Sequence, residues 1–369
     1  MPLDNFIVGS RLRDYGVFFG ETEAYLPRLA ADPCCVFVID ENVWRLHKNS
    51  ALKLLEAFPN IILPVSEEVK TLNSVQMLYD RLAGLATKKN MRLVSIGGGI
   101  TQDITGFAAS TLYRGIKWTF VPTTLLAQAD SCIGGKTSLN YRGYKNLIGT
   151  FYPPSEVFIS SRFISTLKDE DYLSGLGEIA KLCIIGGKRR AEDFSNTSGK
   201  LAGRDPGSLE RFLKAALEIK KDYIEDDEFD SGRRNMLNFG HCFGHAIESA
   251  GDFLVPHGVA VAAGILLADI VARQRGLLSV KTEKFIAQLL LPILKFDFGQ
   301  VRLEEAEMIS AMGRDKKRTG AQLALVMVND DLEMLRVNDL EEGEVCSALA
   351  EFKQSYRDRR QAGDHGIRG

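Results

Sequence analysis

Arg92-Leu-Val-Ser-Ile-Gly-Gly-Gly99 decides the fold, because a short apolar run passes directly into three glycines. Such a run is typical of a buried strand. Similar runs at 35–40 and 61–64 precede it, another follows at 119–124, and a helical pattern covers 71–86. Strands that alternate with helices indicate an α/β domain with a parallel sheet, in which ligands bind at the carboxyl ends of the strands.

The glycines from Gly97 to Gly99 lie where such a sheet would bind the pyrophosphate of a nucleotide. Glycine lets the backbone turn sharply and bring its N–H groups against phosphate, and the following helix adds its dipole. The G-x-G-x-x-G fingerprint of dinucleotide folds is absent, so a plain tight turn is the alternative. Asp40 and Asn42 follow the first strand and could bind ribose hydroxyls, although an Asp here could equally cap a helix.

A second polar segment, after the strand at 119–124, contains Gly134-Gly-Lys-Thr137. This run resembles the end of a P-loop, but Asp130 stands where that motif requires its first glycine. A nucleoside triphosphate site is therefore disfavoured. Lys136 and Asn146, together with backbone N–H groups, instead predict a site for an anion.

Three of the five histidines lie close together in the second half of the chain. His241 and His245 are four residues apart and would share one face of a helix, while His257 begins a second apolar run. Neutral imidazole suits zinc, and a catalytic zinc usually takes three protein ligands. Two histidines at helical spacing are more often structural, however. Gly240 and Gly244 each cost a helix roughly 1 kcal/mol relative to Ala, which suggests that something approaches the backbone closely.

A carboxylate that could complete this site is Glu178, on a helix that the pattern predicts at 169–185. Lys181 lies three residues later and shares a face with it. The alternative is a surface ion pair, worth at most about 1 kcal/mol. The rest of the segment is apolar, and a charge in such surroundings needs a partner.

Further cationic and amide side chains precede the histidines. Lys220 lies near the end of a helix predicted at 209–223. Arg234 and Asn238 are four residues apart, so we expect them to share one helical face, which the first two histidines continue. A solvated face would not normally carry this series of groups.

The second half of the chain is mostly helical in pattern. A largely apolar helical stretch runs over 259–291, and a strand is predicted at 323–328. We therefore predict two domains, an α/β domain at 1–160 and a mainly helical domain at 161–369.

The composition is that of an ordinary globular protein, with 25% charged residues and a net charge of −2. This charge gives no argument for a nucleic-acid partner. No apolar run is expected to reach the roughly 18 residues of a membrane span. The N-terminus lacks the basic and apolar regions of a signal peptide, and the six cysteines form no C-x-x-C pattern. We therefore expect a cytoplasmic protein.

Several spaced motifs occur in one order along the chain. They are Gly-Gly-Gly-x-x-x-Asp at 97–103, Asp-Ser-x-x-Gly-Gly-Lys-Thr at 130–137, Lys-Asn-x-Ile-Gly at 145–149, Glu-x-x-Lys at 178–181, Leu-Asn-x-Gly-His-x-x-Gly-His-Ala-Ile-Glu at 237–248 and His-Gly at 257–258. Together they resemble the sugar phosphate cyclase family, and within it most closely the 3-dehydroquinate synthases. The resemblance covers about residues 40–328.

The resemblance implies NAD in the first domain and a zinc or cobalt ion held by Glu178, His241 and His257, with His245 in the substrate site. It implies conversion of 3-deoxy-D-arabino-heptulosonate 7-phosphate to 3-dehydroquinate and phosphate, a step of the shikimate pathway of aromatic amino acid biosynthesis. In this reaction NAD oxidises C5, phosphate is eliminated, C5 is reduced again and the ring closes by an aldol reaction. NAD is regenerated in each turnover.

The resemblance also assigns roles to individual residues. Those implied in catalysis are Asp130, Lys136, Lys181, Asn238 and His245. Phosphate contacts are implied for Lys136, Asn146, His245, Arg114 and a lysine of the pair Lys316 and Lys317. Carboxylate contacts are implied for Lys220 and Arg234. NAD contacts are implied for Asp40, Asn42, Glu67, Lys70, Gly98, Gly99, Asp103, Thr123, Thr124, Lys145, Thr166 and Leu167. Arg114 is expected to reach the site of a neighbouring subunit, which implies a homodimer.

Four positions depart from the family pattern, namely Val259, Lys168, Ser66 and Tyr144. They leave open a cyclase of the 2-deoxy-scyllo-inosose or valiolone synthase type. A substrate without a carboxylate would not need Lys220 together with Arg234, which favours the first interpretation. A metal-dependent polyol dehydrogenase, or a binding protein with a structural zinc, are further alternatives. A zinc peptidase is disfavoured because no His-Glu-x-x-His occurs.

Overall fold

The computed structural model describes residues 4–85, 89–252, 254–313 and 323–364. The chain forms two compact units. Unit 1 comprises Met1–Gly175 and Lys220–Ser231, and unit 2 comprises Leu176–Ile219 and Gly232–Gly369. The division at residue 160 remains a prediction.

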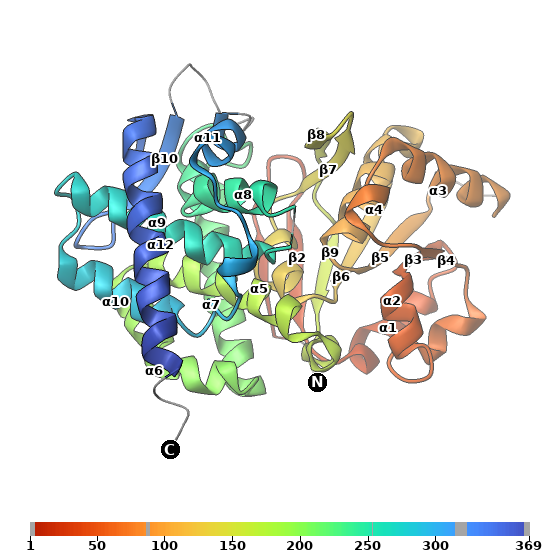
Figure 1. Ribbon diagram of the computed structural model, residues 1–369. Coiled ribbons are helices and arrows are strands. Elements are labelled where there is room, and N and C mark those ends of the chain that lie inside the picture. Colours follow the sequence, from red (N-terminus) through yellow and green to blue (C-terminus); the bar gives the residue numbers. More distant parts are fainter. Residues whose placement is uncertain (1–3, 86–88, 253, 314–322, 365–369) are drawn as a thin grey trace. The chain divides into compact units, whose positions relative to one another are not determined.

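Unit 1 is built on a seven-stranded sheet (Figure 1). In spatial order its strands are β1 (Asp4–Val8), β2 (Tyr15–Phe19), β9 (Glu156–Ile159), β6 (Lys117–Pro122), β5 (Arg92–Gly97), β3 (Cys35–Asp40) and β4 (Asn60–Leu63). All neighbours pair in parallel except β1 with β2. The predicted parallel α/β sheet is thus confirmed. The hairpin β1–β2 and the strand β9 were not predicted.

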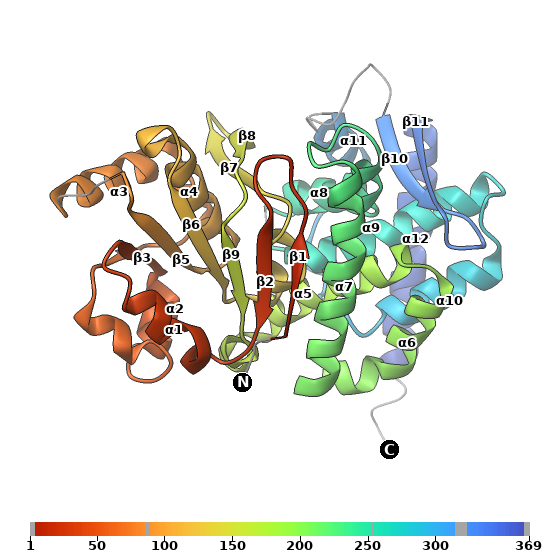
Figure 2. The same cartoon turned by 180° about the vertical axis from the view of Figure 1, so that it is seen from behind.

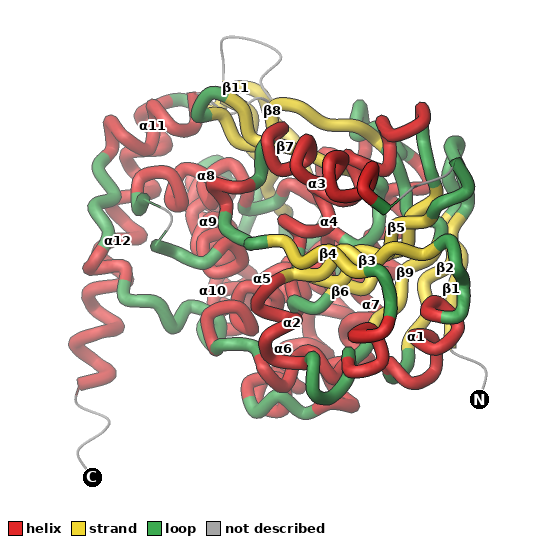
Figure 3. The backbone as a smooth tube through the Cα atoms, turned by 90° about the vertical axis from the view of Figure 1, so that its right-hand side faces the viewer, coloured by secondary structure: helices red, strands yellow, loops and turns green. Residues whose placement is uncertain are grey.

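Helices cover both faces of this sheet. Helices α1 (Thr22–Ala30) and α2 (Glu41–His47) lie on one face, and α3 (Leu72–Gly84) and α4 (Gly99–Thr111) lie on the other (Figure 3). Alternate side chains of a strand point to opposite faces, so Phe37 and Ile39 pack toward α1. Both are fully buried. A parallel sheet covered on both faces explains why the strands read as continuous apolar runs.

The strand order reverses between β3 and β5. From β3 the chain passes outward to β4, and it then returns to the other side of β3 as β5. Ligands of open α/β sheets bind at such a switch point, outside the carboxyl ends of the strands. Asp40 ends β3 and Gly97 ends β5, so the two predicted nucleotide-binding segments meet at this point.

A separate hairpin, β7 (Lys136–Tyr141) and β8 (Tyr144–Phe151), carries the predicted anion-binding residues of unit 1. Arg142 and Gly143 form its turn, both with positive φ, at 49° and 81°. Two such residues match the tight turns that the twist of a hairpin favours. This hairpin was not predicted.

Unit 2 is mainly helical. Two of its helices, α5 (Asp169–Ile185) and α7 (Pro206–Asp226), begin or end in unit 1. Its other helices are α6 (Lys188–Ala202), α8 (His241–Ala250), α9 (His257–Gln274), α10 (Val280–Leu290), α11 (Glu305–Gly313) and α12 (Glu342–Asp364) (Figure 2). Strands β10 (Leu323–Val328) and β11 (Met334–Leu340) form a hairpin. The helix predicted at 169–185 and the strand at 323–328 are confirmed. The stretch predicted to be helical over 259–291 consists of two helices, α9 and α10, because the chain turns at Gly276, with φ of 72°.

Helix α9 is the core of unit 2, with every residue from Gly258 to Ala272 buried. By length and composition α9 could cross a membrane, contrary to the prediction that no segment would meet this criterion. However, 83% of its length is buried in the protein, and the core helix of a soluble protein passes the same test. Helix α9 is therefore weak evidence for a membrane segment.

Glycines bring α8 and α9 into backbone contact. A Cβ added at Gly264 of α9 would lie 2.0 Å from the carbonyl oxygen of Gly240 and 2.7 Å from the nitrogen of Gly244. The close approach predicted at Gly240 and Gly244 is therefore made by another helix. In α5, a Cβ at Gly177 would lie 2.2 Å from the carbonyl oxygen of Gly258. These contacts hold the three helices at a distance that larger residues would not permit.

We predict that Gly264→Ala destabilises the protein by about 2 kcal/mol or more, because backbone atoms cannot move aside as a flexible side chain can. The free energy of unfolding from a denaturant titration measures this. The control is Gly199→Ala in α6, where a new Cβ meets nothing within 4 Å. Ala at that helical position should be neutral or stabilising by up to about 1 kcal/mol. Equal effects of the two substitutions would contradict the packing argument.

Candidate functional site

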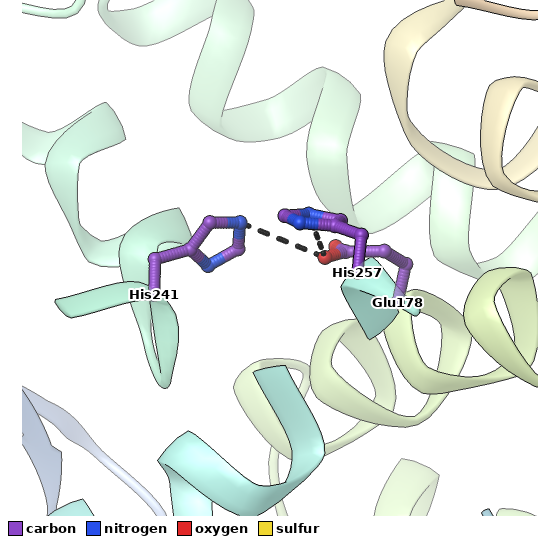
Figure 4. A group of neighbouring side chains, drawn as sticks. All are labelled: Glu178, His241 and His257. Atoms are coloured by element: carbon purple, nitrogen blue, oxygen red, sulfur yellow. Dashed lines mark ion pairs between the residues drawn. The ribbon is translucent and has the colours of Figure 1, made fainter. Parts of the chain in front are cut away.

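The three predicted metal ligands of unit 2 converge. Glu178 comes from α5, while His241 and His257 are the first residues of α8 and α9 (Figure 4). Their ligand atoms lie within 4.8 Å of one another. The Nε2 atoms of His241 and His257 lie 3.6 Å and 3.4 Å from Oε1 of Glu178. Two imidazoles and one carboxylate form a ligand set that zinc sites use.

Each imidazole is oriented by a hydrogen bond from its other nitrogen. The Nδ1 of His241 lies 3.2 Å from the carbonyl oxygen of Phe239, which can only accept. The Nδ1 of His257 lies 3.1 Å from Oε2 of Glu248. A proton on Nδ1 leaves Nε2 of a neutral imidazole as the electron-pair donor, and Nε2 faces Glu178 in both residues. This is how metal-binding histidines are normally held.

Glu178 is fully buried, and its Oε1 accepts no hydrogen bond from the described residues. Burial alone would raise the pKa of this carboxyl, but Lys181 and His257 outweigh burial and hold the pKa well below its usual value. The Nζ of Lys181 lies 2.5 Å from Oε2 of Glu178. A buried carboxylate is costly unless cations face it. The unbonded Oε1 therefore fits a divalent metal ion.

His257 lies between two carboxylates. Burial lowers its pKa, but Glu248 and Glu178 together outweigh burial and raise the pKa to about 10. Such surroundings attract positive charge, whether it is carried by a proton or by a divalent cation. The residues present thus fit a metal ion in charge as well as in geometry.

A second group, His245 with Glu248 and His257, also places its ligand atoms within 4.8 Å. Here Glu248 already accepts the hydrogen bond from Nδ1 of His257. The first group is favoured because its carboxylate has an oxygen without a hydrogen bond and faces two Nε2 atoms. The interpretation of His245 as a non-ligand stays a prediction.

Arg234 and Asn238 do not continue the histidine helix. They lie in the 3₁₀ helix η6 (Arg233–Asn238), and Gly240 then takes a left-handed conformation, with φ of 76°, before α8 begins. The prediction of one helical face through His245 is wrong for this reason. Arg234 is nonetheless buried, with 4% of its surface exposed.

The glycines of unit 1 differ in what surrounds them. A Cβ at Gly97 would meet Thr101 at 2.5 Å, and one at Gly98 would meet Thr124 at 3.0 Å. A Cβ at Gly99 would meet only Ser131, at 3.9 Å. Packing thus requires glycine at position 97 and leaves little room for a side chain at position 98. The third opens α4 in a less crowded place, where backbone N–H groups at a helix start can receive an anion.

The Asp40 side chain caps a helix. Its Oδ1 accepts hydrogen bonds from the backbone N–H groups of Asn42 and Val43, at 2.8 Å and 3.3 Å. The capping interpretation is confirmed, and the predicted ribose contacts of Asp40 and Asn42 remain predictions.

Most of the other residues that were predicted to contact NAD form polar contacts within unit 1. Lys70 pairs with Oδ2 of Asp103 at 2.8 Å, and Oδ1 of Asp103 accepts from the backbone N–H of Ser138. Burial raises the pKa of Asp103 in spite of this pairing. Glu67 accepts from Asn140 at 2.8 Å. The backbone N–H of Thr123 donates to the carbonyl oxygen of Gly97, and the hydroxyl of Thr124 accepts from the backbone N–H of Ala127. The hydroxyl of Thr166 lies within hydrogen-bonding distance of His47, and Leu167 is the next residue. Lys145 lies on β8.

Two of the predicted anion-binding cations of unit 1 are paired with carboxylates. Lys136 forms an ion pair with Asp230. Lys220, buried like Arg234, lies 2.9 Å from Oδ1 of Asp130. Asp130 sits in a short π-helical turn, η4 (Ala127–Ser131), a conformation often found at functional sites.

The remaining predicted phosphate contacts are Asn146, Arg114 and one lysine of the pair Lys316 and Lys317. Asn146, exposed on β8, accepts a hydrogen bond from Ser138 at 2.8 Å. Arg114 is exposed and has a φ of 65°. Lys316 and Lys317 lie outside the described residues.

Two residues at the site were not predicted. Glu248 orients His257, and Asp230 pairs with Lys136. Glu248 is seven residues from His241 and so lies on the same helical face, a spacing that could have indicated it. Asp230 lies at the end of a mainly acidic segment, 225–230, and nothing in the sequence indicates which of its carboxylates pairs with Lys136.

The chain matches two family models over adjoining ranges. The model described as 3-dehydroquinate synthase N-terminal covers residues 60–174, and the model described as 3-dehydroquinate synthase C-terminal covers residues 175–318.

Solved structures share the fold. The 2-epi-5-epi-valiolone synthase of Streptomyces hygroscopicus, with NAD+ and Zn2+ bound, has a TM-score of 0.83 at 24% identity, over 95% of this chain and 99% of that one. A 2-deoxy-scyllo-inosose synthase, complexed with carbaglucose-6-phosphate, NAD+ and Co2+, has a TM-score of 0.80 at 26% identity. The match covers 91% of this chain and 95% of that one.

A curated relative is closer in sequence. The 3-dehydroquinate synthase of Coxiella burnetii (strain CbuG_Q212) is 35% identical over 341 residues, which cover 89% of this chain and 94% of that protein. With both family models matched as well, the chain belongs to the 3-dehydroquinate synthase family.

Proposed function

We propose that this chain is a 3-dehydroquinate synthase, which converts 3-deoxy-D-arabino-heptulosonate 7-phosphate to 3-dehydroquinate and phosphate. The observation that carries the proposal is the convergence of Glu178, His241 and His257 in a chain of this family. The reaction eliminates phosphate and closes a ring, so the enzyme would be a carbon–oxygen lyase.

Two bound groups belong to this proposal. A 26% identical cyclase has been solved with NAD+ and Co2+, and the candidate ligands here suit zinc or cobalt. The metal, held by the three ligands, would supply Lewis acidity at the hydroxyl being oxidised, and NAD would accept and return the hydride. NAD would bind at the switch point of the unit 1 sheet, beside the start of α4.

The protein's own side chains would bind and orient the substrate. We assign the phosphate to Lys136, Asn146, His245, Arg114 and one of Lys316 and Lys317, and the ring hydroxyls to Asp130, Lys181 and Asn238. Lys181 is buried beside Glu178, so its ammonium is held in one place and can donate to an oxygen without reorganising. Asp230 would hold Lys136 in the same way.

The carboxylate distinguishes this substrate from that of other cyclases. Lys220 and Arg234 are both buried cations, with 6% and 4% of their surfaces exposed. Lys220 is held 2.9 Å from Oδ1 of Asp130, so its ammonium stays in one place, from which it could also bind the carboxylate of the substrate. A sugar phosphate without a carboxylate would use neither of them. A cyclase of the 2-deoxy-scyllo-inosose synthase type is the second candidate, favoured by the likeness to that structure.

Two further properties are proposed with the activity. The enzyme would be a homodimer to which Arg114 contributes across subunits. It would be cytoplasmic, in keeping with six free cysteines.

We predict that purified protein with added zinc and catalytic NAD releases phosphate from 3-deoxy-D-arabino-heptulosonate 7-phosphate, with one ring product per phosphate and no net NADH. A phosphate assay and product chromatography measure both. Glucose 6-phosphate, the control substrate without a carboxylate, should release none. Release from glucose 6-phosphate alone would move the assignment to the second candidate.

We predict that His257→Ala loses metal and activity together, because it removes one of three ligands and the partner of Glu248. Metal content is measured by elemental analysis after dialysis against zinc. The matched variant His245→Ala should keep its metal and lose activity. Full metal content in His257→Ala, or loss of metal in His245→Ala alone, would overturn the ligand assignment.

We predict that Arg234→Ala raises KM roughly 10- to 100-fold, as expected for a lost hydrogen bond to a charged group, with metal retained. Steady-state kinetics test this. The adjacent exposed Arg233, replaced by Ala, is the control for charge. An unchanged KM in Arg234→Ala would remove Arg234 from the carboxylate site.

A further inference from the structure

A pocket in unit 2 adjoins the candidate metal ligands. Asn238 and His241 line one side of it, and apolar residues of β10, including Leu325 and Val326, line another. The remaining charged group in the lining is the guanidinium of Arg336, on β11. The pocket thus brings a cation, an amide and a candidate metal ligand to one space.

Arg336 differs from two other half-buried arginines of unit 2, Arg273 and Arg275. Arg273 pairs with Glu283 and Glu351, and Arg275 pairs with Asp339 and Glu344. No carboxylate of the described residues lies within ion-pair distance of Arg336. Its position opposite Val326 in the β10–β11 hairpin directs it to the strand face that this pocket borders.

The surroundings of Arg336 favour an anion. A guanidinium offers five N–H donors and no acceptor, in a planar fork that matches carboxylate and phosphate oxygens. The side-chain amide of Asn238, which also lines the pocket, adds a second kind of donor. The apolar residues of β10 exclude water and lower the local dielectric, which strengthens an ion pair formed there.

We propose that Arg336 binds an anionic group of the substrate, either its carboxylate or its phosphate, from the pocket beside His241. The inference rests on the proposed function, because the sugar phosphate supplies both anions. Arg336 is not among the cations that the family motifs assign. It would therefore add a contact to those that the family motifs imply.

The test is binding and turnover by Arg336→Ala as NAD- and zinc-loaded protein. We expect KM for 3-deoxy-D-arabino-heptulosonate 7-phosphate to rise roughly 10- to 100-fold, with kcat, zinc content and thermal midpoint unchanged. Arg336→Lys should recover part of the loss, because it keeps the charge without the fork. Arg302→Ala, an exposed arginine outside the pocket, is the matched control.

Calorimetric titrations with two fragments identify the anion. Weaker binding of inorganic phosphate by Arg336→Ala supports a phosphate contact, and weaker binding of unphosphorylated 3-deoxy-D-arabino-heptulosonate supports a carboxylate contact. If Arg336→Ala and Arg302→Ala behave alike with both fragments, or if the unsubstituted protein binds neither, the proposal is wrong. These titrations need no turnover, so they test the role of Arg336 even if the protein shows no cyclase activity.

Discussion

The candidate metal centre depends on close backbone contact between three helices. Glycines allow α8 to meet α9 at Gly264 and α5 to meet α9 at Gly177, at distances where any Cβ would collide with a carbonyl oxygen. Each of these helices carries one ligand, and two of the ligands are the first residue of their helix. Small changes in helix separation would move the ligand atoms apart by a similar distance. Glycines that weaken the helices individually are therefore explained by the site they create together.

Acidic and basic side chains alternate at the candidate metal centre. The buried Glu178 faces Lys181 and two imidazoles, and His257 in turn faces Glu248. The centre is thus a set of alternating charges in a site of low exposure, where each group fixes the position of the next. Such fixed polar groups can stabilise developing charge without reorganising. Ion pairs also fix cations in unit 1, where Lys70, Lys136 and Lys220 pair with Asp103, Asp230 and Asp130.

Local patterns predicted much of this structure. Strand β3 and helix α5 have the bounds that their apolar patterns indicated, and the order of motifs pointed to the family. What the patterns missed depends on backbone angles and on contacts between distant segments. The break before α8 requires a left-handed Gly240, which helical spacing does not reveal. Asp230 meets Lys136 across 94 residues, a contact that only the folded chain defines.

The most direct test of this account is X-ray absorption at the zinc edge of the metal-loaded protein. It reports the elements around the ion, their distances and the number of imidazoles. A zinc ion held by Glu178, His241 and His257 would show two imidazole nitrogens and carboxylate oxygen at about 2.0–2.2 Å, without sulfur. A sulfur neighbour at about 2.3 Å would identify a thiolate ligand, such as Cys242 beside His241, and a third imidazole would place His245 in the ligand set. Either result would contradict the centre formed by Glu178, His241 and His257.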